Sequence, residues 1–257
     1  MARKALPNVL NPLISIVGGL VLWEVVARLL DRPVILIPPS SIGSTFVRLL
    51  QQGQLPYHTA VSVMEFTSGF LVASLVGIGL GIVMAAWRPV RQLLEPWVIA
   101  LYSTPIIAVA PLFIFAFGVG IGSKVMIALL MAFPPILMNS FTGIKMVDPE
   151  FVEVGRSFKA STNQIFVKVL IPGAVPFIIT GLRIGWSRAL VGMVVGEMLG
   201  ALAGLGFLII NAGQILRMDE MYTAVIILMF FGMLGNQLLN VCEGKLAPWA
   251  TMRADRE

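Results

Sequence analysis

The sequence predicts an all-α protein that spans a membrane, a helical bundle with about six transmembrane helices. Of its 257 residues, 58% are hydrophobic and 12% are charged, and the apolar residues form long runs separated by short polar stretches. A helix must hold about 20 apolar residues to cross a hydrocarbon core that is about 30 Å thick. In such a chain the net charge of +5 reflects basic residues in cytoplasmic loops rather than nucleic-acid binding.

The apolar runs place the expected spanning helices at roughly residues 13–30, 61–87, 94–117, 125–144, 176–199 and 222–241. A loop at 31–58, with a short amphipathic piece at 42–50, follows the first of them. The Gly-rich stretch 201–220 contains a short apolar piece, 205–212, which either dips into the membrane or lies at its surface. We therefore divide the chain into an N-terminal helix with an external loop (1–60), a membrane core (61–243) and a cytoplasmic tail (244–257).

Small residues recur at every fourth position in two of these helices. The second helix carries Gly69, Ala73, Gly77, Gly81 and Ala85, and the fifth carries Gly181, Gly185 and Ala189 on one row, with Gly192, Gly196 and Gly200 on another. Small side chains let a neighbouring helix approach closely where lipid provides no hydrophobic drive for association. We expect both rows to be packing faces.

A polar interruption at residues 147–172 predicts a hairpin of two short helices. Asp148 before Pro149 is a helix start, and Ser161 with Gln164 forms a capping box at a second start, so the second helix should end before Pro172. The apolar residues of the first helix share one stripe surrounded by charged residues. These apolar residues are Phe151, Val154 and Phe158, and the charged residues are Glu150, Glu153, Arg156 and Lys159. Such an apolar knob is suited to a groove on a soluble partner.

The distribution of basic residues predicts the orientation. With both termini in the cytoplasm, the cytoplasmic set is Arg3, Lys4, Arg88, Arg91, Lys145, Arg156, Lys159, Lys168, Lys245, Arg253 and Arg256, and the external set is Arg28, Arg32, Arg48, Lys124 and Arg217. The cytoplasmic set is the larger, as the positive-inside rule requires. The hairpin should therefore lie in the cytoplasm.

Charged residues inside membrane spans are costly and become candidates for a solute path. Arg188 and Glu197 lie deepest, about 13 Å apart along one helix, so each needs another partner or water. We interpret Glu24 and Glu65 as residues with local partners near helix ends or packing faces, and Arg183 as bound to a helix end or a lipid headgroup.

The third helix offers further candidates for the path. Pro105 and Pro111 should kink or locally open it, so Tyr102 and Ser103 either line the path or belong to a packing kink. A metal site is not expected, because His58 is the sole histidine and Cys242 the sole cysteine. The chain also lacks a reactive cluster that would support an integral membrane enzyme.

The hairpin resembles the coupling segment of permease subunits in ATP-binding-cassette importers. Glu153, Val169, Ile171 and Pro172 fit the spacing E-A-A-x3-G-x9-I-x-L-P, while Val154 and Gly155 replace the alanines and Lys159 replaces the glycine. The segments GLRIG (181–185), VVGEMLGA (194–201) and GLGFLI (204–209) are similar to the nitrate, sulfonate, taurine and pyrimidine-precursor branch of binding-protein-dependent type I importers. The resemblance covers residues 38–243.

The resemblance implies a division of labour among several proteins. The chain would be the channel and not the enzyme, and it would bind no cofactor itself. Its partners would be a second permease copy, two cytoplasmic ATP-binding subunits that hold ATP and Mg, and an external binding protein. The membrane would be the bacterial inner membrane. The implied ATPase-coupling residues are Phe151, Glu153, Val154, Gly155, Phe158, Lys159 and Pro172.

The cargo and one rival function stay open. The resemblance implies a nitrate-, sulfonate- or taurine-like anion, or a pyrimidine precursor or aromatic compound. An ion- or proton-coupled secondary transporter would also explain the helices and the intramembrane charges. It would work without ATP, and it does not explain the spacing of the hairpin.

Overall fold

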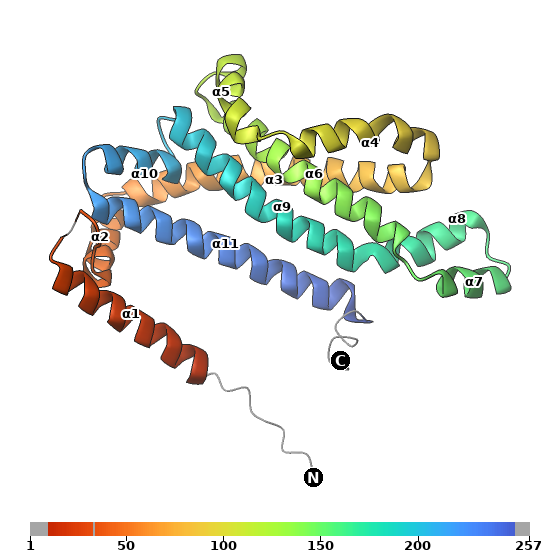
Figure 1. Ribbon diagram of the computed structural model, residues 1–257, viewed down its shortest axis with the longest axis horizontal. Helices are drawn as coiled ribbons and strands as arrows, with labels where there is room; N and C mark the ends of the chain where they lie inside the picture. Colours follow the sequence, from red (N-terminus) through yellow and green to blue (C-terminus); the bar gives the residue numbers. More distant parts are fainter. Residues whose placement is uncertain (1–9, 33, 250–257) are drawn as a thin grey trace, which may run out of the picture.

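The computed structural model describes residues 10–249 except residue 33, and all elements in this part of the chain are helical (Figure 1). They are α1 (Leu10–Leu30), α2 (Pro39–Gln51), α3 (Gln54–Ala86), α4 (Arg88–Ser103), α5 (Ile106–Phe117), α6 (Ile121–Lys145), α7 (Pro149–Ser157), α8 (Thr162–Ile165), the π-helical turn η1 (Phe166–Leu170), α9 (Ile171–Gly200), α10 (Leu205–Gln214) and α11 (Met218–Leu246). The all-α prediction is confirmed for these residues. The basic residues expected at 3, 4, 253 and 256 lie outside them.

Four helices within the described residues are long and apolar enough to cross a membrane: α3, α6, α11 and the continuous helix Thr162–Gly200. The bent pair α4 and α5 makes a fifth span if it crosses as one unit. The first of the six expected spans is present as α1, a helix of 21 residues that exposes many apolar side chains. Its place in the bilayer stays a prediction.

The helix expected at 94–117 is two helices that meet at an angle of 99°. The break lies at Thr104 and Pro105, where Thr104 has an extended backbone (φ −74°, ψ 128°). Pro105 has no N–H to donate, and its ring disfavours the helical conformation of the residue before it. Pro111 lies inside α5 and leaves that helix intact. The prediction of one kinked helix therefore underestimated the break, because α4 ends completely before Pro105.

Helix α6 lies between α3 and α9, and the glycines of both rows face it, except Gly200, which faces Ile114 of α5. A β carbon on Gly81 would lie 2.7 Å from Ser140 Cβ and 2.8 Å from the carbonyl oxygen of Leu137. A β carbon on Gly185 would lie 2.6 Å from Ile136 Cδ1. Both predicted packing faces are confirmed, and they pack against one shared helix.

The hairpin caps are present as predicted. The Asp148 side chain accepts a hydrogen bond from the backbone N–H of Glu150 at 3.0 Å. At the second start, Ser161 N donates to Gln164 Oε1 at 2.8 Å, and Gln164 N donates to Ser161 Oγ at 3.3 Å. Between the two helices Lys159 has φ +56°, the left-handed conformation that favours glycine. The sequence pattern of importer permeases has glycine at this position.

The second hairpin helix does not end before Pro172, which corrects the prediction. The chain passes from α8 through η1 into α9 as one helix of 39 residues. In the π-helical turn, the N–H of Ile171 donates to the carbonyl of Phe166, five residues earlier. This wider turn lets the helix continue into a proline that has no N–H of its own.

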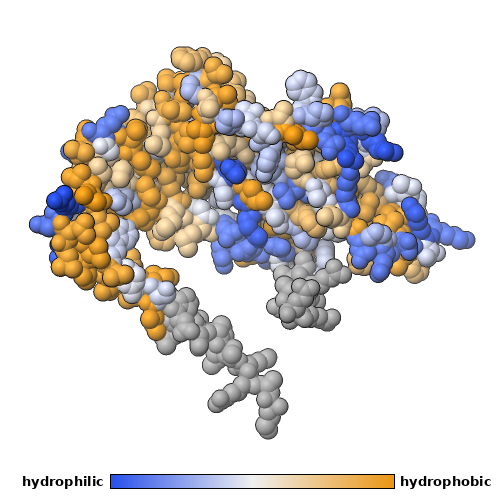
Figure 2. All heavy atoms as spheres, in the orientation of Figure 1, coloured by the Kyte–Doolittle hydropathy of each residue, from blue (hydrophilic) through white to orange (hydrophobic). Residues whose placement is uncertain are grey.

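The two ends of the long axis differ in what they carry. The hairpin forms one end and extends beyond the end of α11, while α2 and α10 lie at the opposite end (Figure 1). Hydrophilic residues gather over the hairpin and the neighbouring turn between α3 and α4, with a smaller group at the opposite end (Figure 2). Orange, apolar surface covers much of the half away from the hairpin, and a further hydrophilic group lies near the middle of this face.

The contact between α3 and α6 gives a test of the packing. We expect Gly81→Val to lower the stability of the protein in detergent by about 1–3 kcal/mol, because the new β carbon meets backbone that cannot move aside. Gly79→Val is the matched control, since a β carbon on Gly79 meets no atom within 4 Å. Thermal unfolding followed by tryptophan fluorescence compares the two. Equal stability of both variants would contradict the packing described here.

The left-handed turn of the hairpin gives a second test. We expect Lys159→Gly to be more stable than Lys159→Ala by about 1 kcal/mol, because alanine keeps the β carbon that strains this conformation. Both variants lack the lysine side chain, so the comparison isolates the backbone. Hydrogen exchange of the hairpin amides measures the difference, and faster exchange in the glycine variant would show that the turn is not left-handed.

Candidate functional site

The break between α4 and α5 borders a cavity of about 190 Å³ that is open at the surface of this chain. Tyr102, Thr104 and Pro105 lie on one side, Pro134 and Pro135 of α6 on another, and Arg188 of α9 also borders it. The lining is mostly apolar, with Tyr102, Thr104 and Arg188 as its polar residues. Three segments far apart in the sequence therefore meet at the point where the bend opens the bundle.

Arg188 is the charged residue of this cavity, and it has neither an ion pair nor a hydrogen bond among the residues that the structure describes. Arg183, five positions earlier on α9, has partners on α11. It donates to Asn240 Oδ1 at 2.6 Å and to Glu243 Oε2 at 2.8 Å. Arg183 therefore binds side chains in the last two turns of α11, while the charge of Arg188 is left for a solute or for water.

The structure brings together only part of the predicted path. Tyr102 and Arg188 both line the cavity, whereas Ser103 and Glu197 do not. Thr104, next to Ser103, lines it instead, and its hydroxyl donates to the carbonyl of Ala100 at 2.8 Å. The sequence signal at Pro105 identified the right bend but not which of its neighbours would face inward.

Glu197 is fully buried at the far end of α9, where it binds the start of α10. Its carboxylate accepts hydrogen bonds from Ser62 Oγ and from the backbone N–H of Gly206, both at 2.5 Å. A carboxylate beside the first N–H groups of a helix also interacts favourably with the helix dipole. In this conformation Glu197 joins α3, α9 and α10 and does not border the cavity.

Two charges near Glu197 are also buried, which sequence reasoning missed. Lys124 was expected in an external loop, but its ammonium is buried and donates to the backbone carbonyls of Val119, Gly120 and Gly200. Glu65 is buried as well and lies within electrostatic reach of Lys124 and Glu197. Glu65 thus lies on a packing face of α3, one of the two places expected for it, and belongs to a buried charge cluster whose members come from three different helices.

Glu24 has the local partners expected of it. Its carboxylate accepts hydrogen bonds from Arg28 Nε at 2.7 Å, from Ser40 Oγ at 2.7 Å and from Ser40 N at 3.0 Å. These bonds join α1 to the start of α2, so Glu24 has a structural role here.

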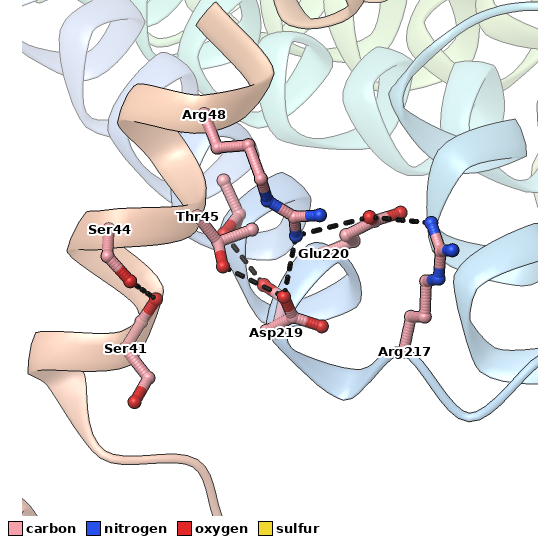
Figure 3. A network of polar contacts seen from close by, with 8 residues as sticks. Ser41, Ser44, Thr45, Arg48, Arg217, Asp219 and Glu220 are labelled. Carbon is pink, nitrogen blue, oxygen red and sulfur yellow. Dashed lines mark hydrogen bonds and ion pairs between the residues drawn. The ribbon is translucent and has the colours of Figure 1, made fainter.

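A second polar network joins α2 to the start of α11 at the end opposite the hairpin (Figure 3). Arg48 contacts Asp219 at 2.8 Å and Glu220 at 3.3 Å, and Arg217 contacts Glu220 at 3.2 Å. Thr45 donates to Asp219 at 2.8 Å. The sequence signal that could have found this network is the acidic pair at the first turn of α11, where the helix dipole favours carboxylates.

The apolar stripe of the hairpin is exposed. Phe151 and Val154 are 53% and 54% exposed, and Phe158 is 83% exposed. Glu153 is exposed too, and the described residues offer its carboxylate no partner. Gly155 faces the second hairpin helix, since a β carbon there would lie 3.4 Å from Ile165 Cγ1.

The hairpin borders a wide cavity of about 1030 Å³ together with Pro172 of α9 and Trp249 near the end of the described chain. Phe151, Val154 and Gly155 contribute to this lining. Six of the predicted coupling residues lie on the hairpin, and Pro172 lies where the hairpin passes into the membrane core. The structure therefore groups these residues at one end of the molecule.

Comparison with known proteins agrees with this arrangement. Residues 77–251 match the family described as binding-protein-dependent transport system inner membrane component. The chain is 32% identical to a putative aliphatic sulfonates transport permease protein of Bacillus subtilis, over 97% of this chain and 87% of the relative. It is 32% identical to a taurine transport system permease protein of Escherichia coli, over 88% of this chain and 84% of the relative. A formylaminopyrimidine transport permease protein of Halalkalibacterium halodurans is 30% identical, over 93% and 96%.

Solved structures show the same fold. An inward-facing conformation of the MetNI methionine ABC transporter matches with a TM-score of 0.62 at 21% identity, over 73% of this chain and 93% of the solved chain. A second crystal form matches with a TM-score of 0.60 at 19% identity, over 72% and 94%. This similarity concerns the fold of the membrane core. The family match and the permeases that are at least 30% identical establish that the chain belongs to the binding-protein-dependent inner membrane components and is a permease subunit of an ABC importer.

Proposed function

We propose that the chain works with separate ATPase subunits and forms the path for a small solute with an anionic group. The observation that carries this proposal is Arg188, a cation without a partner among the described residues, which borders a cavity at a break between two helices. Sulfonates and taurine, which the names of relatives mention, carry such a group. A formylaminopyrimidine, named for another relative, does not require it.

The hairpin is the proposed docking site for the ATPase. Its exposed apolar stripe suits a hydrophobic groove, and the unpaired carboxylate of Glu153 can accept hydrogen bonds from donors at the groove's edge. ATP and Mg would be held by the ATPase subunits. One hairpin per permease corresponds to two ATPases on a pair of permeases.

The helix Thr162–Gly200 supports a direct mechanical coupling. It begins in the hairpin and passes the cavity at Arg188, about 39 Å further along at about 1.5 Å per residue. A movement imposed on the hairpin by ATP binding would therefore displace a wall of the path. Because the rows on α3 and α9 consist of small residues, their side chains do not obstruct α6 when the helices slide past one another. The cavity could then open alternately to each side of the membrane.

Orientation and assembly belong to the same proposal. The hairpin and both chain termini lie in the cytoplasm, in agreement with the basic residues of the hairpin and of the turn between α3 and α4. The membrane is a bacterial inner membrane. A second, identical copy would complete the path. The alternative of a secondary transporter gives no role to the exposed hairpin stripe.

Docking by the hairpin can be tested through co-purification. We expect the double variant Phe151→Asp, Val154→Asp to lose a soluble ATPase that co-purifies with the unaltered chain in mild detergent, because two charges would enter an apolar groove. Asn163→Asp is the matched control, since it adds a charge to an exposed position of the same hairpin. Retention of the ATPase by the double variant would refute docking at this stripe.

The role of Arg188 can be tested through uptake. We expect Arg188→Ala to lower ATP-driven uptake of taurine or an alkane sulfonate at least tenfold, with Arg188→Lys retaining part of it, because the path loses its cation. The ATPase should co-purify with both variants. Unchanged rate and affinity in the alanine variant would exclude Arg188 from the path.

A further inference from the structure

Helix α10 is fixed at its start by side chains from two other helices. Three successive backbone N–H groups donate outward: Gly204 to His58 Nδ1 at 3.0 Å, Leu205 to Ser62 Oγ at 2.8 Å, and Gly206 to Glu197 Oε2 at 2.5 Å. The first N–H groups of a helix have no partner within the helix. Here α3 and α9 supply the partners, so the start of α10 cannot move independently of the bundle.

The other end of α10 is fixed as well. The chain turns through Ile215 and Leu216 into α11, and the next residue, Arg217, contacts Glu220 at 3.2 Å. Glu220 also contacts Arg48 of α2 at 3.3 Å (Figure 3). The turn therefore lies directly beside the network between α2 and α11, at the extreme of the long axis opposite the hairpin (Figure 1).

This fixed turn exposes two apolar side chains, one of them on a strained backbone. Ile215 and Leu216 are 54% and 63% exposed, and Leu216 has φ +58°. Glycine is the usual residue in this conformation after a helix, because a β carbon there costs free energy. A leucine in its place is unfavourable for folding in two ways, through its backbone and through its exposed side chain. Such strain gathers at sites with a function.

The charges around the turn are arranged by depth. Arg217 and Arg48 have side chains that are 59% and 44% exposed, whereas those of Asp219 and Glu220 are 29% and 8% exposed. The carboxylates thus lie beneath the guanidinium groups. The outer surface presents an apolar pair next to two positive charges.

We propose that residues 214–217, together with Arg48, form the docking surface for the external binding protein. This inference rests on the proposed function and identifies the surface at which the permease would bind one partner of the importer, the external binding protein. The family is described as binding-protein-dependent, and this turn lies at the end away from the ATPase hairpin. The surface fits a partner with an apolar depression bordered by carboxylates. A turn held by two networks is already ordered, so less conformational freedom is lost on binding.

The first test is photo-crosslinking in the native cells with p-benzoylphenylalanine in place of Ile215. The expected result is an adduct with a soluble solute-binding protein, identified by mass spectrometry. The same photo-crosslinker in place of Leu238, a residue of α11 that is 52% exposed, should give no such adduct. Adducts at 215 with lipid alone, with a second copy of this chain, or with no protein would overturn the proposal.

The second test measures the affinity of the crosslinked binding protein for the assembled transporter in nanodiscs. Leu216→Gly should weaken that affinity at least fivefold while the melting temperature stays the same or rises, because the backbone strain is relieved. Asp31→Gly, which relieves a φ of +47° outside this surface, should leave the affinity unchanged. Unchanged affinity in Leu216→Gly, or a parallel loss of affinity and melting temperature, would overturn the docking role.

The docking surface and the proposed function can be refuted independently of each other. If the ATPase co-purifies and uptake needs ATP, but residue 215 gives no adduct with a binding protein, the docking surface is wrong and the proposed function stands. If no ATPase co-purifies with the unaltered chain, the proposed function itself fails.

Discussion

The close contact of α6 with α3 on one side and α9 on the other is the constraint on which the membrane core depends. Lipid tails are as apolar as leucine, so burial alone does not hold these helices together. Glycines on α3 and α9 remove the side chains that would separate the backbones, and dispersion contacts then act at short range. The cavity lies beside this trio, at the break between α4 and α5, and Arg188 of α9 borders it.

Buried charges close the bundle at the end opposite the hairpin. Lys124 binds the last carbonyl of α9, and Glu197, three residues earlier on that helix, accepts a hydrogen bond from the Gly206 amide in the first turn of α10. A helix end buried without partners would be costly in a membrane, since no water is available to satisfy it. Two side chains of opposite charge thus satisfy backbone groups on the two sides of the turn between α9 and α10.

Local signals were the most predictable part of the sequence. The caps at Asp148 and Ser161 involve residues two or three positions apart, so the pattern contains the whole interaction. The small-residue rows predicted packing faces, although not that both would face α6. Pro105 predicted a bend whose size the sequence does not contain, because the angle depends on what packs around α5.

Interactions between helices that are distant in the sequence could not be predicted from the sequence. Nothing in the sequence pairs Lys124 with Gly200, or Glu197 with Ser62, until the helices are placed side by side. The same limit explains why Glu197 was grouped with Arg188: both are deep in one helix, but they lie toward different neighbours. The rule that a helix ends before a proline failed at Pro172, because a π-helical turn supplied the extra spacing that the proline needs.

The π-helical turn η1 also sets how far the helix before it is rotated about the helix axis relative to the helix after it. An α-helix advances by about 100° per residue, and a π-helical turn contains one residue more than an α-helical turn. The residues of α8 are therefore rotated about the axis of the continuous helix Thr162–Gly200, relative to the residues of α9, by an amount that the one extra residue fixes. The direction in which α8 presents Ile165 to Gly155 of α7, relative to the direction in which α9 presents Arg188, depends on this single turn. Two ends of one helix are in this way set to face different neighbours.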